Sequence, residues 1–140
     1  MYSSSPPRPL RVFVADDDDE MRAFVTATLH TSGCSTVEAR DGRELLDLLR
    51  NALDEADLRP DVIVADVKMP GLSGLGVLAA LKRTKWDLPV VLITVLTDES
   101  IDTVAKRLGA VGILHKPFDP DDLLTAVRNA TAIRALRARG

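Results

Sequence analysis

Short apolar runs alternate along this chain with longer segments in which apolar residues recur at helical spacing. The short runs are rich in β-branched residues, which predicts strands, and they cover residues 11–15, 35–39, 61–65, 90–94 and 111–115. The helical spacing predicts one helix after each strand, near 21–29 and 45–53, over about 75–83, near 101–108 and over 119–137. This succession of strand–helix units predicts an α/β domain with a parallel sheet.

Glycine, proline and aspartate mark several of the predicted boundaries. Gly33 and Gly109 end the first and fourth helices, and the Asp-Gly pair at 41–42 predicts a turn before the second helix. Asp119 is the expected N-cap of the last helix, and Pro120 is its expected first residue.

The length of the chain, 140 residues, suits a single domain with a hydrophobic core. Right-handed crossovers would place helices on both faces of the sheet, so the predicted fold class is a doubly wound, five-stranded parallel sheet with five helices. We expect a disordered leader over residues 1–9, the domain itself over 10–130, and a basic C-terminal helix extension over 131–140.

Polar residues follow four of the predicted strands. Asp16 and Asp17 come after the first strand, Asp66 after the third, Thr94 ends the fourth, and Lys116 follows the fifth. Because the carboxyl ends of parallel strands meet at one edge of the sheet, these side chains should line a single shallow pit. Like-charge repulsion between the carboxylates should raise the pKa of at least one of them.

The three acids that follow, Asp18, Asp19 and Glu20, need no role in that pit. Acidic residues at a helix start accept hydrogen bonds from free backbone N–H groups and interact favourably with the positive end of the helix dipole. We therefore interpret them as helix-capping residues.

Composition indicates the cellular compartment and the classes of partner that we expect for the domain. No apolar run approaches the length of about 20 residues that a membrane span needs, and the one cysteine, Cys34, suits a reducing cytoplasm. The net charge is −3, although the last ten residues carry three arginines and no acid. An acidic body of this kind does not indicate direct nucleic-acid binding by this chain. We expect a cytoplasmic protein without a membrane span.

Four motifs occur in an order and spacing that resemble the receiver domains of two-component response regulators, the CheY-like family. They are "ADDDDEMR", "DVKMPGLSG", the threonine that ends "PVVLIT", and "GILHKPF". The resemblance covers about residues 10–130. It implies the flavodoxin-like strand order 2-1-3-4-5.

The resemblance also implies roles for the acidic residues. Asp66 would be the phosphoacceptor, taking a phosphoryl group from a histidine kinase or phosphotransfer protein. Asp17, Asp66 and the backbone carbonyl of Lys68 would bind Mg²⁺ directly, and Asp16 would reach it through water. Mg²⁺ prefers such oxygen ligands and keeps several waters. The resemblance thus implies that the domain catalyses only its own phosphorylation and dephosphorylation and is otherwise not an enzyme.

Two further residues receive roles from the same resemblance. Lys116 would bind the phosphate or Asp66 through its ammonium group, and the family has a cis peptide bond before the proline that corresponds to Pro117. Thr94 would donate its hydroxyl to a phosphate oxygen once Asp66 is modified. The output would pass through the last helices and strands, either as a homodimer or as contact with a downstream target.

The chain departs from the common receiver pattern at two positions. Val95 replaces the usual small residue after the threonine, and Ile113 replaces the usual aromatic residue or histidine in the fifth strand. In the family, an aromatic side chain at this position of the fifth strand usually rotates as the threonine moves. With Ile113 in its place, this switch is unavailable in its usual form. Lys68, two residues after Asp66, is a third position that bears on the lifetime of an aspartyl phosphate.

Three alternatives compete with this interpretation. A phosphatase of the haloacid dehalogenase type also places aspartates after its first strand, but its D-x-D-x-T/V motif is matched only in part. The segment "GLSGLG" at 71–76 has its glycines in the reverse order of a dinucleotide-binding loop, so a turn and helix start are favoured. The third alternative, motivated by Ile113, is a receiver-fold interaction module that is never phosphorylated.

Overall fold

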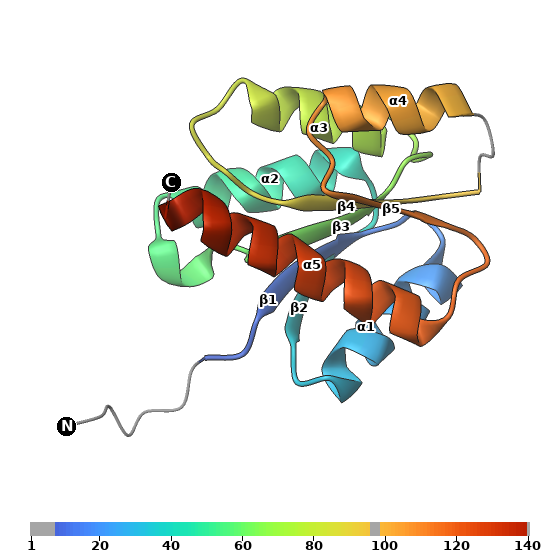
Figure 1. Cartoon of the computed structure of the whole chain (residues 1–140), viewed down its shortest axis with the longest axis horizontal. Helices are drawn as coiled ribbons and strands as arrows, with labels where there is room; N and C mark the ends of the chain where they lie inside the picture. The colour runs from blue at the N-terminus through green and yellow to red at the C-terminus, as the bar shows by residue number, and fades with distance from the viewer. Residues whose placement is uncertain (1–7, 96–98, 140) are drawn as a thin grey trace.

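The computed structural model describes residues 8–95 and 99–139, which form one parallel sheet covered by helices on both faces (Figure 1). The strand order is β2-β1-β3-β4-β5, which confirms the predicted fold class and order. The strands are β1 Arg11–Ala15, β2 Ser35–Ala39, β3 Val62–Asp66, β4 Val90–Thr94 and β5 Gly112–His115. The helices are α1 Asp19–Thr31, α2 Gly42–Leu53, α3 Gly74–Lys82, α4 Glu99–Arg107 and α5 Pro120–Arg139, with a short 3-10 turn, η1, at Ala56–Leu58.

Alternate residues of the strands build two separate cores, because successive side chains of a strand point to opposite faces. Val12, Val64 and Ile93 pack with α1 and α5 on one face. Phe13 and Leu92 pack with α2, α3 and α4 on the other. Figure 1 shows α2, α3 and α4 above the sheet and α1 and α5 below it. The near-continuous apolar character of β3 and β4 is explained by this burial on both faces.

Some predicted boundaries are wrong by one or two residues. Gly42, predicted to lie in a turn, is the first residue of α2; Asp41 lies in the bend before it and is the N-cap, with its side chain accepting a hydrogen bond from Glu44 N–H. The third strand begins at Val62 rather than Asp61 and includes Asp66. The extra residue in β3 matters because it makes Asp66 part of the sheet itself.

The ends of the chain are only partly described. Most of the predicted leader, residues 1–7, lies outside the described residues, while the guanidinium of Arg8 pairs with Asp61 at 3.0 Å. The predicted extension continues α5 as far as Arg139, and residue 140 lies outside the described part. In the described part of the chain, no helix has the length and apolar character that crossing a membrane requires.

Candidate functional site

The ends of β1 and β3 bring three carboxylates together. Ala15 pairs with Ala65 across the two neighbouring strands, so the aspartates that follow them lie side by side. One carboxylate oxygen from each of Asp16, Asp17 and Asp66 lies within 4.8 Å of the others. We call these three residues the acidic cluster. Asp16 and Asp66 are buried and Asp17 is exposed, which leaves the cluster open to solvent on one side.

Lys116 supplies a positive charge beside the acidic cluster. Its Nζ lies 3.6 Å from Asp66 Oδ2 and 3.8 Å from Asp16 Oδ2, and its side chain is only 16% exposed. The Lys116–Pro117 peptide bond is cis, as the resemblance implied. The Lys116 backbone N–H donates to the Thr94 carbonyl at 2.8 Å, which joins the ends of β4 and β5. Thr94 is itself buried at the end of β4.

Burial raises the pKa of two carboxyls in the cluster. The pKa of Asp16 rises from 3.8 to about 6, and that of Asp66 also rises. We expected like-charge repulsion to be the cause, but loss of solvation is the larger effect in both residues, with repulsion adding to it. A hydrogen bond from the Asp18 N–H and the charge of Lys116 act in the opposite direction on Asp16.

The loop after β1 is held by its own side chains. The Asp18 carboxylate accepts hydrogen bonds from Glu20 N–H and Met21 N–H, so its predicted role as a helix cap is confirmed. The Asp18 N–H donates to Asp16 Oδ1 at 2.9 Å. Arg22, which the sequence patterns did not single out, donates to the backbone carbonyl of Asp16. Arg22 is the last residue of the motif "ADDDDEMR", but it received no role from the sequence, and its contacts reveal one.

The segment after β3 approaches Asp66 closely. The Lys68 N–H donates to Asp66 Oδ1 at 3.4 Å, and the Gly74 N–H donates to the Val67 carbonyl at 3.0 Å. A Cβ atom at Gly74 would lie 2.5 Å from the Asp66 carbonyl oxygen, so a glycine is needed there. Residues 71–76 are a turn followed by the start of α3, as we inferred from the order of their glycines.

The acidic cluster has the chemistry of a divalent-cation site. Hard cations such as Mg²⁺ and Ca²⁺ take oxygen ligands, and carboxylates are the usual protein donors. Asp16 Oδ2 is buried without a hydrogen-bond partner, which is costly unless another positive group satisfies it. Lys116 approaches that atom only at 3.8 Å. The residues present therefore fit a bound metal ion.

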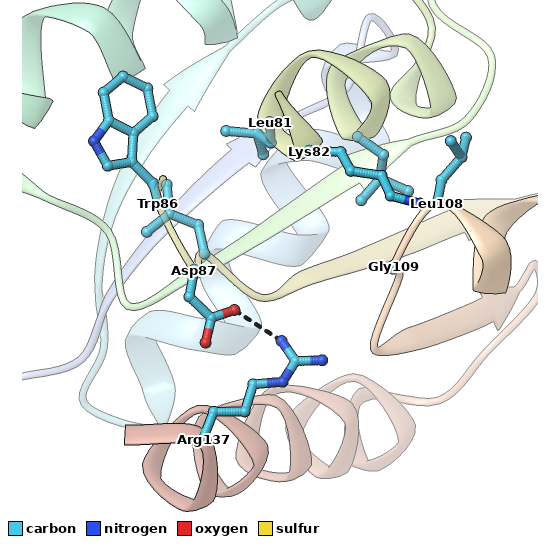
Figure 2. Close-up of a pocket in the computed structure, with 9 residues that line it drawn as sticks. Leu81, Lys82, Trp86, Asp87, Leu108, Gly109 and Arg137 are labelled. Carbon is cyan, nitrogen blue, oxygen red and sulfur yellow. Dashed lines mark hydrogen bonds and ion pairs between the residues drawn. The ribbon is translucent and has the colours of Figure 1, made fainter. Parts of the chain in front are cut away.

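A second hollow lies at the opposite edge of the sheet. Figure 2 shows it beside Trp86 and Asp87, which precede β4, and near Gly109, which precedes β5. Its lining carboxylate, Asp87, pairs with Arg137 of α5 at 2.8 Å. Trp86 is 37% exposed and lies beside leucine side chains, so it covers an apolar edge of the domain. This hollow offers no cluster of carboxylates, so we assign the chemistry to the strand ends.

Comparison with known proteins decides the family. The family model described as the response regulator receiver domain matches residues 12–128. The chain belongs to the response regulator receiver family. Its acidic cluster and Lys116 thus lie in a receiver domain of two-component response regulators.

Related receiver domains occur in longer proteins and as separate structures. The chain is 39% identical over 120 residues to response regulator MprA of Mycolicibacterium vanbaalenii, covering 86% of this chain and 49% of that protein. It is 37% identical to the C4-dicarboxylate transport transcriptional regulatory protein DctD of Pseudomonas aeruginosa, covering 90% of this chain and 26% of DctD. The chain therefore spans between a quarter and a half of the length of these curated relatives.

Solved receiver structures have the same fold. The chemotaxis response regulator CheY4 of Vibrio cholerae superposes with a TM-score of 0.77 at 31% identity, covering 87% of this chain and 98% of CheY4. A Francisella receiver domain superposes with a TM-score of 0.80 at 30% identity, covering 89% of this chain and 98% of that one.

The two departures from the common pattern have defined places in this receiver domain. Val95 is 58% exposed directly after Thr94. Ile113 is half-buried on β5 and packs against the core beneath α2, α3 and α4. Neither side chain belongs to the acidic cluster, so both leave its carboxylates in place.

Proposed function

We propose that this receiver domain accepts a phosphoryl group on Asp66 in a Mg²⁺-dependent reaction. The donor is a histidine kinase or a phosphotransfer protein, and the domain performs no catalysis other than its own phosphorylation and dephosphorylation. The observation that carries the proposal is the convergence of Asp16, Asp17 and Asp66 with the ammonium group of Lys116 at the strand ends.

The transfer forms one bond and breaks another. A carboxylate oxygen of Asp66 bonds to phosphorus while the bond between phosphorus and the donor's imidazole nitrogen breaks, and that nitrogen keeps the electron pair. Burial of Asp66 excludes much of the water that would compete for the phosphoryl group. The Lys116 ammonium, 3.6 Å from Asp66 Oδ2, stabilises the negative charge that the phosphoryl oxygens bring to this site. We assign to the Thr94 hydroxyl a hydrogen bond to one phosphoryl oxygen.

Asp17, Asp66 and the Lys68 backbone carbonyl would hold Mg²⁺, with Asp16 acting through water. When bound, the ion neutralises phosphoryl oxygens that would otherwise be repelled by the carboxylates. Without the ion, the acidic cluster would repel an incoming phosphoryl group. The ammonium of Lys116, within 4 Å of two of its carboxylates, would then offset that repulsion only in part.

We further propose that the modified domain signals from the cytoplasm through α4, β5 and α5, by forming a homodimer or contacting a downstream protein. Light scattering of the full chain, with and without a phosphoryl mimic, tests the homodimer. A monomer under both conditions would leave contact with a different protein as the output.

Acetyl phosphate tests the phosphorylation directly. The full chain is incubated with this donor and Mg²⁺, and its intact mass is measured at short times. We expect a rise of about 80 Da, the mass of one added HPO₃ group. The rise should be absent in Asp66→Asn and with EDTA. It should persist in Asp47→Asn, whose carboxylate is 72% exposed and pairs with Arg50 on α2.

A fast hydrolysis of the acyl phosphate would hide the mass change, so inorganic phosphate release from acetyl phosphate is followed in parallel. If the wild-type chain shows neither a mass rise nor Asp66-dependent phosphate release, phosphorylation is excluded under these conditions. The receiver-fold interaction module then becomes the better description of the domain.

A further inference from the structure

Arg22 joins three parts of the molecule around the loop that carries Asp16 and Asp17. Its Nη1 donates to the Asp16 backbone carbonyl at 2.7 Å. Its Nη2 contacts Asp19 Oδ1 at 2.6 Å, and its Nε contacts Glu38 Oε1 on β2 at 3.1 Å. The side chain is 13% exposed. Every nitrogen of the guanidinium is therefore engaged, and the group links α1, β2 and the acidic loop.

The carbonyl that Arg22 binds belongs to the peptide unit between Asp16 and Asp17. The plane of that peptide fixes where the Cα of Asp17 lies, and together with the φ angle of Asp17 it sets the direction in which the side chain leaves the backbone. Among the described residues, none donates a hydrogen bond to the Asp17 carboxylate. Its place beside Asp66 thus depends on how its own backbone is held.

We propose that Arg22 is a positioning residue for the divalent cation, because it fixes the peptide that aims Asp17 at the acidic cluster. This inference rests on the proposed function, since it names how the metal site of that function is held. Groups that orient metal ligands without touching the metal commonly change its affinity by about 10- to 100-fold.

Charge alone predicts the opposite effect. Arg22 is a cation near a site for another cation, so by Coulomb repulsion its removal should strengthen divalent-ion binding. Positioning predicts that its removal weakens binding. The sign of the change therefore separates the two roles.

The geometry also distinguishes arginine from lysine. The acceptors on Asp16, Asp19 and Glu38 are met by three nitrogens in one planar group. A lysine ammonium keeps the charge but is a single point on a flexible stem, and it cannot hold the same three acceptors in fixed directions. Arg22→Lys should consequently behave like Arg22→Gln rather than like the wild type.

The experiment measures Mg²⁺ binding by titration calorimetry on the metal-stripped full chain. The variants are Arg22→Gln and Arg22→Lys, with Arg50→Gln as the control. Arg50 lies about two turns along α2 from the strand ends, and its side chain is 72% exposed. We expect about tenfold weaker Mg²⁺ binding in both Arg22 variants and wild-type binding in the control.

Calcium provides a readout that general destabilisation would not move. Mg²⁺ demands near-octahedral geometry, whereas Ca²⁺ tolerates irregular ligand sets. Misplacing Asp17 should therefore weaken Mg²⁺ binding more than Ca²⁺ binding. An equal loss for both ions would count against positioning.

In the Arg22 variants, either of two results overturns the inference while leaving the proposed function intact. One is unchanged or tighter Mg²⁺ binding in Arg22→Gln; the other is full retention of affinity in Arg22→Lys. If the wild-type chain itself binds no Mg²⁺, the proposed function fails instead. Should the Arg22 variants not fold, Glu38→Ala replaces them, since it removes the acceptor of Arg22 Nε at a half-exposed position. Unchanged Mg²⁺ affinity in that variant would overturn the inference.

Discussion

Replacing Asp16 by asparagine should stabilise the metal-free domain. Asp16 is 1% exposed, and its Oδ2 atom is buried without a hydrogen-bond partner. Its pKa is raised to about 6, chiefly by burial. A negative charge at this position therefore opposes folding when no cation is bound. Asparagine removes the charge and keeps an oxygen that can accept the Asp18 N–H, as Asp16 Oδ1 does now.

The magnitude follows from the difference between the folded and unfolded pKa values. Asp16 moves from 3.8 to about 6 on folding, and one pKa unit corresponds to about 1.4 kcal/mol. At pH 7 the ionised Asp16 thus costs up to about 3 kcal/mol of folding free energy. The folded state holds this proton more tightly than the unfolded state. The contribution of Asp16 to stability is therefore most favourable below pH 4 and is lost as the pH rises towards 6.

Urea unfolding with EDTA between pH 4 and 7.5 tests this reasoning. Asp16→Asn should be more stable than the wild type by up to about 3 kcal/mol at pH 7, and the difference should shrink towards zero at pH 4. Asp47→Asn, the exposed control, should change stability by no more than about 0.5 kcal/mol. Added Mg²⁺ should stabilise the wild type more than Asp16→Asn. An Asp16→Asn variant that is no more stable than the wild type at pH 7 would refute the assigned cost.

Three further outcomes are expected, each measured by urea unfolding without metal. Lys116→Met should lower stability at pH 7 by about 1–3 kcal/mol, because it leaves two buried carboxylates without their counter-charge. The loss should be smaller at pH 5, and an equal loss at both pH values would contradict the role of Lys116 as their counter-charge. Gly74→Ala should destabilise the domain by about 1–3 kcal/mol, because the new Cβ would lie 2.5 Å from a backbone oxygen at the end of β3. The control is Gly112→Ala, where the nearest neighbour of a new Cβ lies at 3.5 Å, and its loss of stability should be much smaller. A double-mutant cycle on Arg137 and Asp87, which pair at 2.8 Å while about half-exposed, should give a coupling of about 0.2–1 kcal/mol that falls in high salt.

Local patterns were sufficient for the elements of the sheet and their order along the chain. The apolar runs of β3 and β4 have no polar interruption because both faces of each strand are covered, and that signal is visible without coordinates. Boundaries were less certain, as Asp41 shows. An Asp-Gly pair is compatible with a turn, and only the hydrogen bond from Glu44 N–H to its side chain identifies Asp41 as an N-cap.

The residues of the acidic cluster were also predictable, whereas the forces acting on them were not. Asp16, Asp17, Asp66 and Lys116 follow strands, and parallel strands end at one edge of a sheet. The leading cause of the raised pKa of Asp16 is burial. Burial depends on how α1 and the neighbouring strands pack around the loop, and the spacing of charges along the chain does not contain this information.

By itself, the sequence determined which side chains stand at the strand ends, because strand periodicity and chain order are local properties. Tertiary structure decided which of those carboxylates loses its solvent, which atoms of Lys116 they meet, and that Arg22 of α1 reaches both the Asp16 carbonyl and Glu38 of β2. Such contacts join residues through the packing of separate elements, and a contact of that kind has no signature in the order of residues along the chain.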